Sequence, residues 1–236
     1  MADRPAGHHL VCGSRPWNRD TFERVAAAVP GTWSFAATPA ELDAALASGP
    51  EPAWVFFLHW SWIVPPRVHG AHRCVVFHMT DLPYGRGGSP LQHLILAGRT
   101  ETVLSAIVMT DELDAGPVYA KRRLSLAGTA EEIYRRADGV AEELIAHLVA
   151  EEPVPSPQVG EPVVFARRRP AQSEVPPDLP DLAAWYDFVR MLDADGYPHA
   201  FIDHGRFRIT LRDAELHDGS TTVQATIDPR PAEEAS

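Results

Sequence analysis

The 236-residue chain has few cysteines and lacks both a secretory leader and a membrane-length apolar run. Its two cysteines, Cys12 and Cys74, lie in separate short apolar runs, with no CxxC pair and no metal-ligand spacing. We interpret them as buried free thiols and expect no metal site. The N-terminus has no basic segment followed by a long apolar one, and no run approaches the roughly 18 apolar residues of a membrane span. We therefore expect a soluble cytoplasmic protein.

Basic residues are also in deficit. The chain has 21 Lys and Arg against 32 Asp and Glu, which gives a formal net charge of -11. Binding to a nucleic-acid backbone depends on clustered Lys and Arg that release counterions from the phosphates. The composition therefore argues against nucleic acid as the main partner, although it leaves room for a small basic site.

Apolar runs alternate with amphipathic stretches over the first 110 residues. The predicted strands are 9–14, 32–37, 52–60, 73–78 and 102–110, and the predicted helices are 19–29, 39–47 and 90–97. Most of these strands are continuously apolar, which is typical of a parallel sheet covered on both faces. We expect an α/β fold: a Rossmann-like, mostly parallel sheet flanked by helices, with a small C-terminal α+β segment.

The rest of the chain predicts a different organisation. Residues 118–126 indicate a strand, and 129–151 indicate a long amphipathic helix in which Thr129 and Glu132 have capping-box spacing. We expect a Rossmann-like domain over 1–150, a Pro-rich connection over 151–181, a small C-terminal subdomain over 182–220 and a tail over 221–236.

Two polar side chains follow apolar runs in a way that suggests chemistry. His78 ends the run RCVVFH before a Pro- and Gly-rich loop, and Asp114 lies in the acidic loop DELDAG after the run TVLSAIVMT. A lone histidine there is usually a packed side chain, and a short acidic cluster is usually a solvated turn. Together they favour an acid/base pair at the carboxyl ends of strands, where open α/β sheets bind ligands.

Four segments extend this pattern. They are HWSWIVPP (59–66), FHMTDLPYGRGGSPLQ (77–92), DELDAGPVY (111–119) and YDFVRMLDADGYPHAF (186–201). In this order and at these separations they resemble the folate-dependent formyltransferases, a family that includes methionyl-tRNA formyltransferase and the amino-sugar N-formyltransferases. The resemblance covers residues 9–212, which is most of the chain.

The resemblance implies that 10-formyltetrahydrofolate donates a formyl group to a primary amine. His78 would hold the amine neutral or take its proton, because histidine titrates near neutral pH, and Asp114 would orient the imidazole. The residues expected at the folate are Trp62, Ile63, Val64, Asp111 and Leu113. The residues expected at the substrate are Arg86, Gly87, Gly88 and Ser89, with Arg86 either meeting an anionic group or fixing the loop.

One position departs from the family pattern. Val76 stands two residues before His78, where the family usually has an asparagine that is thought to hold the formyl oxygen. Loss of one such donor typically lowers the rate by about 10²–10³-fold. Either another donor replaces it, with His59, Ser61, Thr80 or a backbone N–H of the Gly-rich loop as candidates, or the enzyme is slow or inactive. We expect a replacement.

The sequence gives less information about the amine that accepts the formyl group. Because the chain is acidic and looks too short for a full tRNA-binding C-terminal domain, we expect a small-molecule amine, foremost a nucleotide-linked amino sugar, and no nucleic acid or membrane partner. The alternatives are an amino acid, a siderophore or antibiotic intermediate, and a hydrolase that releases formate from the same cofactor. A folate-binding protein without catalysis and a homodimer are also left open.

Overall fold

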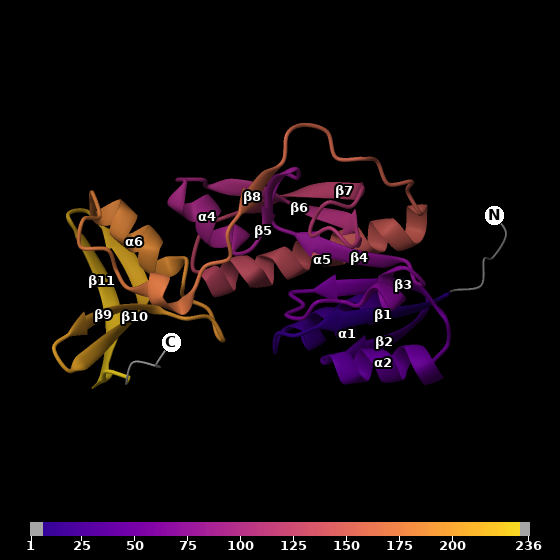
Figure 1. The fold of residues 1–236 in the computed structure, drawn as a ribbon, viewed down its shortest axis with the longest axis horizontal. Coiled ribbons are helices and arrows are strands. Elements are labelled where there is room, and N and C mark those ends of the chain that lie inside the picture. Colours follow the sequence, from indigo (N-terminus) through magenta and orange to yellow (C-terminus); the bar gives the residue numbers. More distant parts are fainter. Residues whose placement is uncertain (1–6, 232–236) are drawn as a thin grey trace. The chain divides into compact units, whose positions relative to one another are not determined.

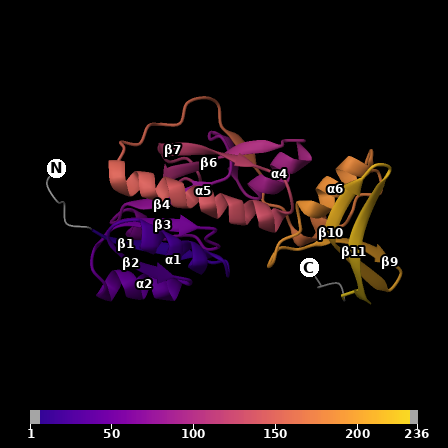
Figure 2. The same cartoon turned by 180° about the vertical axis from the view of Figure 1, so that it is seen from behind.

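The computed structural model describes residues 7–231, which form two compact units (Figures 1 and 2). The first unit holds the chain up to Gly87, together with Thr102–Leu124 and Arg135–Val164. The second holds Gly88–Glu101, Ser125–Tyr134 and the chain from Phe165 onward. The sequence instead suggested one boundary near residue 150, followed by a separate connection. None of the helices among the described residues combines the length and apolar character needed to cross a bilayer.

A six-stranded sheet organises the first unit. Its strands, in spatial order, are β2 (Thr32–Ala36), β1 (His8–Gly13), β3 (Pro52–Leu58), β4 (Cys74–His78), β6 (Glu101–Val108) and β7 (Val118–Ser125). The first four are parallel, whereas β6 runs antiparallel to β4. The predicted fold class, a mostly parallel sheet flanked by helices, is confirmed.

Among the described residues, four helices lie wholly or partly in this unit, and all but the short α3 were predicted from the sequence. They are α1 (Asn18–Ala28), α2 (Pro39–Ser48), the short α3 (Pro66–His69) and α5 (Ala130–Glu151). The start of α5 confirms the predicted capping box, because the Glu132 N–H donates to Thr129 Oγ1 and the Thr129 N–H donates to Glu132 Oε2.

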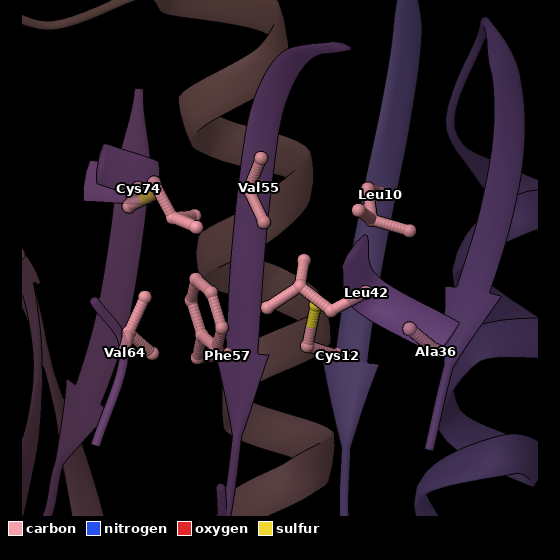
Figure 3. Close-up of a cluster of buried hydrophobic side chains, with 9 residues drawn as sticks. Leu10, Cys12, Ala36, Leu42, Val55, Phe57, Val64 and Cys74 are labelled. Atoms are coloured by element: carbon pink, nitrogen blue, oxygen red, sulfur yellow. The ribbon is translucent and has the colours of Figure 1, made fainter. Parts of the chain in front are cut away.

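A buried apolar cluster fills one face of the sheet (Figure 3). Its members from the strands are Leu10, Cys12, Ala36, Val55, Phe57 and Cys74, and those from outside the strands are Leu42, Val64 and Val68. Burial raises the pKa of the Cys74 thiol to about 12 and that of Cys12 well above its usual value. Both cysteines are free and buried, as the sequence indicated.

A two-stranded sheet pairs β5 (Tyr84–Gly87) with β8 (Val163–Phe165). The Val163 N–H donates to the Pro83 carbonyl at 3.1 Å. β8 lies in the predicted Pro-rich connection and β5 in the predicted Pro- and Gly-rich loop after His78, where the glycines hide the extended backbone.

The second unit contains α4 (Pro90–Leu96), a 3₁₀ turn at Pro170–Ser173, α6 (Leu182–Arg190) and a three-stranded antiparallel sheet. The sheet order is β11 (Ser220–Pro229), β10 (Phe207–His217) and β9 (Ala200–His204). The prediction of a tail from 221 is wrong over 221–229. Asp218 and Gly219, with Gly219 at φ 79°, make a two-residue hairpin turn that pairs β11 with β10.

His9 is a buried histidine at the start of β1. Its ring packs against Trp33, with 4.6 Å between ring centroids, and neither ring nitrogen has a hydrogen-bond partner among the described residues. Burial, and secondarily the nearby His8, lowers the pKa of His9 below its usual value of 6.5. The folded protein therefore disfavours protonation of this ring.

This burial predicts a loss of stability in mild acid. Below pH 6.5 the unfolded chain takes up a proton at His9 that the folded chain does not, so the free energy of unfolding should fall as the pH drops from 7.5 to 5.5. In urea unfolding, His9→Phe should show a shallower fall than wild type. The control His217→Gln, at an exposed histidine, should keep the full fall. Equal pH dependence in wild type and His9→Phe would contradict the assignment.

Candidate active site

His78 and Asp114 meet in the first unit. His78 ends β4, and its Nδ1 lies 3.5 Å from Asp114 Oδ1, with both side chains largely buried. At 3.5 Å this contact is longer than a normal hydrogen bond, and it becomes an ion pair when the ring is protonated. The sequence prediction that these two side chains converge therefore agrees with the structure.

The route by which Asp114 reaches His78 differs from the expected one. We predicted that both residues stand at carboxyl ends of parallel strands, but β6 is antiparallel, so its carboxyl end lies beside the start of β4. The Met109 N–H donates to the carbonyl of Cys74, at that start. The loop after Met109 then runs back along β4, which brings Asp114 to His78.

Backbone geometry in this loop explains two residues of the LDAG segment. Asp114 has φ 54°, a left-handed conformation that aspartate tolerates better than most residues. A Cβ on Gly116 would come within 1.8 Å of the Val108 carbonyl oxygen, so only glycine fits there. The return of the chain into β7 therefore depends on Gly116.

The second ring nitrogen of His78 is also engaged. Nε2 lies 2.7 Å from the Gly85 carbonyl oxygen, and because a carbonyl only accepts, Nε2 carries the proton in this bond. The other Asp114 oxygen, Oδ2, accepts the Gly87 N–H at 2.9 Å. The imidazole thus lies between two acceptors, and a neutral ring with its single N–H can donate to only one of them.

Val76 lies on the same face of β4 as His78 and is partly exposed. The three side chains considered as replacements for its missing donor all have other partners. The Thr80 hydroxyl is buried and donates to the Gly85 carbonyl at 3.3 Å. His59 Nε2 contacts Asp138 Oδ1 at 2.9 Å, and Ser61 Oγ bonds Ser14 Oγ at 2.9 Å. A replacement by any of these stays a prediction.

The residues predicted at the folate divide into exposed and buried groups. Trp62, Ile63 and Leu113 expose 44%, 86% and 61% of their surface, whereas Val64 belongs to the apolar cluster of Figure 3. Asp111 is exposed and contacts His69 of α3 at 3.5 Å. This contact joins the segment after β3 to the acidic loop.

The residues predicted at the substrate have internal partners. Arg86 donates to Gln158 Oε1 from Nε (3.1 Å) and Nη2 (2.9 Å) and to Glu112 Oε1 from Nη1 (3.1 Å). Its guanidinium therefore fixes the loop, which was one of the two roles considered for it. Gly87 contacts Asp114 as described above.

Gly88 and Ser89 pack inside the second unit. A Cβ on Gly88 would lie 2.5 Å from Cβ of Arg167. Ser89 Oγ accepts from the Arg168 N–H at 3.1 Å and lies 3.3 Å from the Tyr197 hydroxyl. The substrate role of these residues stays a prediction.

Sequence reasoning missed two polar groups of the first unit. Gln158, between prolines and glycine in the connection, donates to the carbonyls of Asp114 (2.8 Å) and Gly116 (2.9 Å). Asp138 of α5 is buried and, besides His59, accepts from Asn18 (2.7 Å) and Thr21 (2.9 Å). No pattern marks Gln158, while Asp138 stands out as an acid near the apolar stripe of α5.

No cluster of three or more His, Cys, Asp or Glu side chains suited to a metal ion occurs within residues 7–231.

Comparisons with known proteins show similarity to formyltransferases. A solved methionyl-tRNA formyltransferase from Clostridium thermocellum is 39% identical, with a TM-score of 0.90 over 95% of this chain and 100% of that one. The methionyl-tRNA formyltransferase of Sorangium cellulosum is 32% identical over 70% of this chain and 54% of its own length. A sugar N-formyltransferase from Shewanella shares the fold, with a TM-score of 0.64 at 16% identity over 96% of this chain and 99% of that one.

The profile described as "Methionyl-tRNA formyltransferase, C-terminal domain" matches residues 170–228. Together with the end-to-end match in Clostridium thermocellum, it shows that the chain belongs to the formyltransferase family. The predictions of this family, of an enzyme and of 10-formyltetrahydrofolate as the one-carbon donor of the family are confirmed. The chain spans about a third to just over half the length of the curated relatives that it matches.

The prediction of a small-amine acceptor without a nucleic-acid partner is wrong. The relatives with the higher sequence identities are named methionyl-tRNA formyltransferases. The segment that looked too short for a tRNA-type C-terminal domain is the one that this domain profile matches. Net charge misled the prediction because it averages over the chain, whereas phosphate binding depends on local charge.

The Asp114–His78 contact predicts a separable catalytic effect. Asp114→Asn should keep the Gly87 contact but lose the charge beside the imidazole, lowering kcat by about 10²–10⁴-fold with little change in reduced-folate affinity. Steady-state kinetics and calorimetric titration with 5-formyltetrahydrofolate measure the two effects. Asp43→Asn, at an exposed carboxylate of α2 paired with Arg67, is the control. Equal losses of turnover and affinity would contradict the role of Asp114.

Proposed function

We propose that this chain is an N-formyltransferase that moves a formyl group from 10-formyltetrahydrofolate to the amino group of methionyl-tRNA. The observation that carries the chemistry is the approach of His78 to Asp114 within the family motifs. The acceptor is inferred from the names of the relatives and from the C-terminal match over residues 170–228. An amino sugar has support only from likeness of fold, at low sequence identity.

The first unit has suitable groups for a reduced folate. A pterin is flat and partly apolar, and it needs exposed apolar side chains beside backbone polar groups. Trp62, Ile63 and Leu113 are exposed apolar residues on two segments that the His69–Asp111 contact joins. Bound there, the folate would supply an electrophilic formyl carbon.

His78 is the base in the proposed mechanism. An ammonium cannot attack a formyl carbon, so the amine must lose a proton, and imidazole can take it near neutral pH. This requires the ring proton to lie on Nδ1, facing Asp114, and Nε2 to give up its bond to the Gly85 carbonyl so that its lone pair faces the amine. Asp114 would accept a hydrogen bond from Nδ1–H and stabilise the imidazolium that forms when Nε2 takes the amine proton. The imidazolium would then return that proton to the tetrahydrofolate nitrogen from which the formyl group departs.

An acceptor assay tests the proposal. The chain is incubated with 10-formyltetrahydrofolate and either methionyl-tRNA or a nucleotide-linked amino sugar, and the products are identified by mass spectrometry. We expect formylmethionyl-tRNA, its loss in His78→Ala and its persistence in the control His72→Ala. Formylated sugar without formylmethionyl-tRNA would overturn the acceptor, and formate released without any acceptor would indicate a hydrolase.

Val76 gives a second test of the same chemistry. Val76→Asn places an amide donor two residues before His78, where the family has its asparagine, and should raise kcat by up to about 10²-fold if the wild type lacks a donor for the formyl oxygen. Val76→Leu is the control for size. A large fall in kcat for Val76→Asn would mean that the pocket is built around valine.

A further inference from the structure

We propose that Gln158 is a positioning residue that sets the protonation geometry of His78 by fixing the main chain of Asp114. The inference rests on the proposed function. It assigns a role to a side chain in the Pro-rich connection, outside the four segments that carry the family resemblance.

The amide of Gln158 is fully used. Its Nε2 donates to the carbonyls of Asp114 and Gly116, at 2.8 and 2.9 Å. Its Oε1 accepts two bonds from Arg86, at 3.1 and 2.9 Å. The Gln158 amide thus satisfies both its N–H donors and both acceptor sites of its oxygen. Its partners lie in the loop that holds Asp114 and in β5.

The main chain that Gln158 holds is a demanding one. Asp114 is left-handed, and Gly116 approaches the Val108 carbonyl too closely for any side chain. Asp111 and Glu112 on the same loop are exposed, so solvent surrounds that part of the chain. A left-handed conformation in a non-glycine residue persists where its surroundings over-determine it. The two hydrogen bonds from Gln158 to the carbonyls of Asp114 and Gly116 meet that need.

Arg86 links this arrangement to the catalytic pair from the other side. Its neighbour Gly87 donates directly to Asp114 Oδ2, and Gly85, on its other side, accepts from His78 Nε2. β5 therefore supplies one partner of the His78 ring, Gly85, and contacts the other, Asp114, through Gly87. Arg86 of the same strand bonds Gln158. A shift of the Asp114 main chain would change the contact of 3.5 Å between Asp114 Oδ1 and His78 Nδ1.

A purely structural role is a weaker explanation, because the connection has its own anchors on both sides of Gln158. Ser156 exchanges two backbone hydrogen bonds with Val118, at 2.7 and 2.9 Å, and Val163 bonds Pro83. The segment would stay attached to the first unit without the Gln158 amide.

Two substitutions separate the functions of the amide. Gln158→Glu keeps an acceptor for Arg86 but cannot donate to the two carbonyls, whereas Gln158→Leu loses both. Both should lower kcat by about 10- to 100-fold, as the loss of groups that orient active-site ligands does, while KM for 10-formyltetrahydrofolate stays within about threefold. Gln224→Glu, the same chemical change on exposed β11, should behave as wild type.

A second readout does not need the acceptor. In the full chain labelled with ¹⁵N-histidine, the ring-nitrogen shifts of His78, assigned with His78→Ala, report which nitrogen carries the proton. We expect Gln158→Glu to change these shifts and Gln224→Glu to leave them unchanged. If wild type formylates no acceptor, the proposed function fails, but the NMR shifts still test the positioning role. Unchanged His78 shifts in Gln158→Glu would overturn the positioning role, as would a kcat equal to that of wild type. A Gln158→Leu variant whose melting temperature and kcat fall while its His78 shifts stay constant would also overturn it.

Discussion

A buried carboxylate beside a buried imidazole is the constraint on which the rest of this site depends. Removing a charge from water is unfavourable unless hydrogen bonds and an opposite charge replace the lost solvation. Asp114 Oδ2 accepts a hydrogen bond from the Gly87 N–H, and Oδ1 faces the His78 ring, which supplies the opposite charge once it takes up a proton. Three features bring those partners together: the glycine-rich β5, the left-handed conformation of Asp114, and Gly116 two residues further on.

The partners of the ring define two states of the site. In the described state Nε2 donates to Gly85, and Nδ1 faces Asp114. In the state needed for proton abstraction, Nε2 is open to the amine, and Nδ1 donates to the carboxylate. The Gly85 carbonyl therefore favours the tautomer whose Nε2 carries the proton, and Nε2 is free to take a proton only when this bond is released.

Much of this arrangement could be predicted from the sequence, because local patterns encode it. Continuously apolar runs indicated the strands of the parallel sheet, and the HMTDLPYGRGG and DELDAG segments indicated the pairing of His78 with Asp114. The direction of β6 could not be predicted, because a buried strand looks the same in either direction. Gln158 could not be found either, since its partners are mostly backbone carbonyls distant in sequence. β11 was not predicted although Asp218-Gly219 is a strong hairpin signal, because the polar, Pro-containing end of the chain is typical of a frayed tail.

The reversed direction of β6 has a consequence for how this family can vary. From the Met109–Cys74 bond, the chain must return along the length of β4, roughly 13 Å for four residues of strand, before Asp114 can meet His78. Five residues reach at most about 17 Å when fully extended. The stretch from Met109 to Asp114 is therefore only slightly longer than the distance it must span. Unlike most surface loops, it should tolerate changes of side chain far better than deletions.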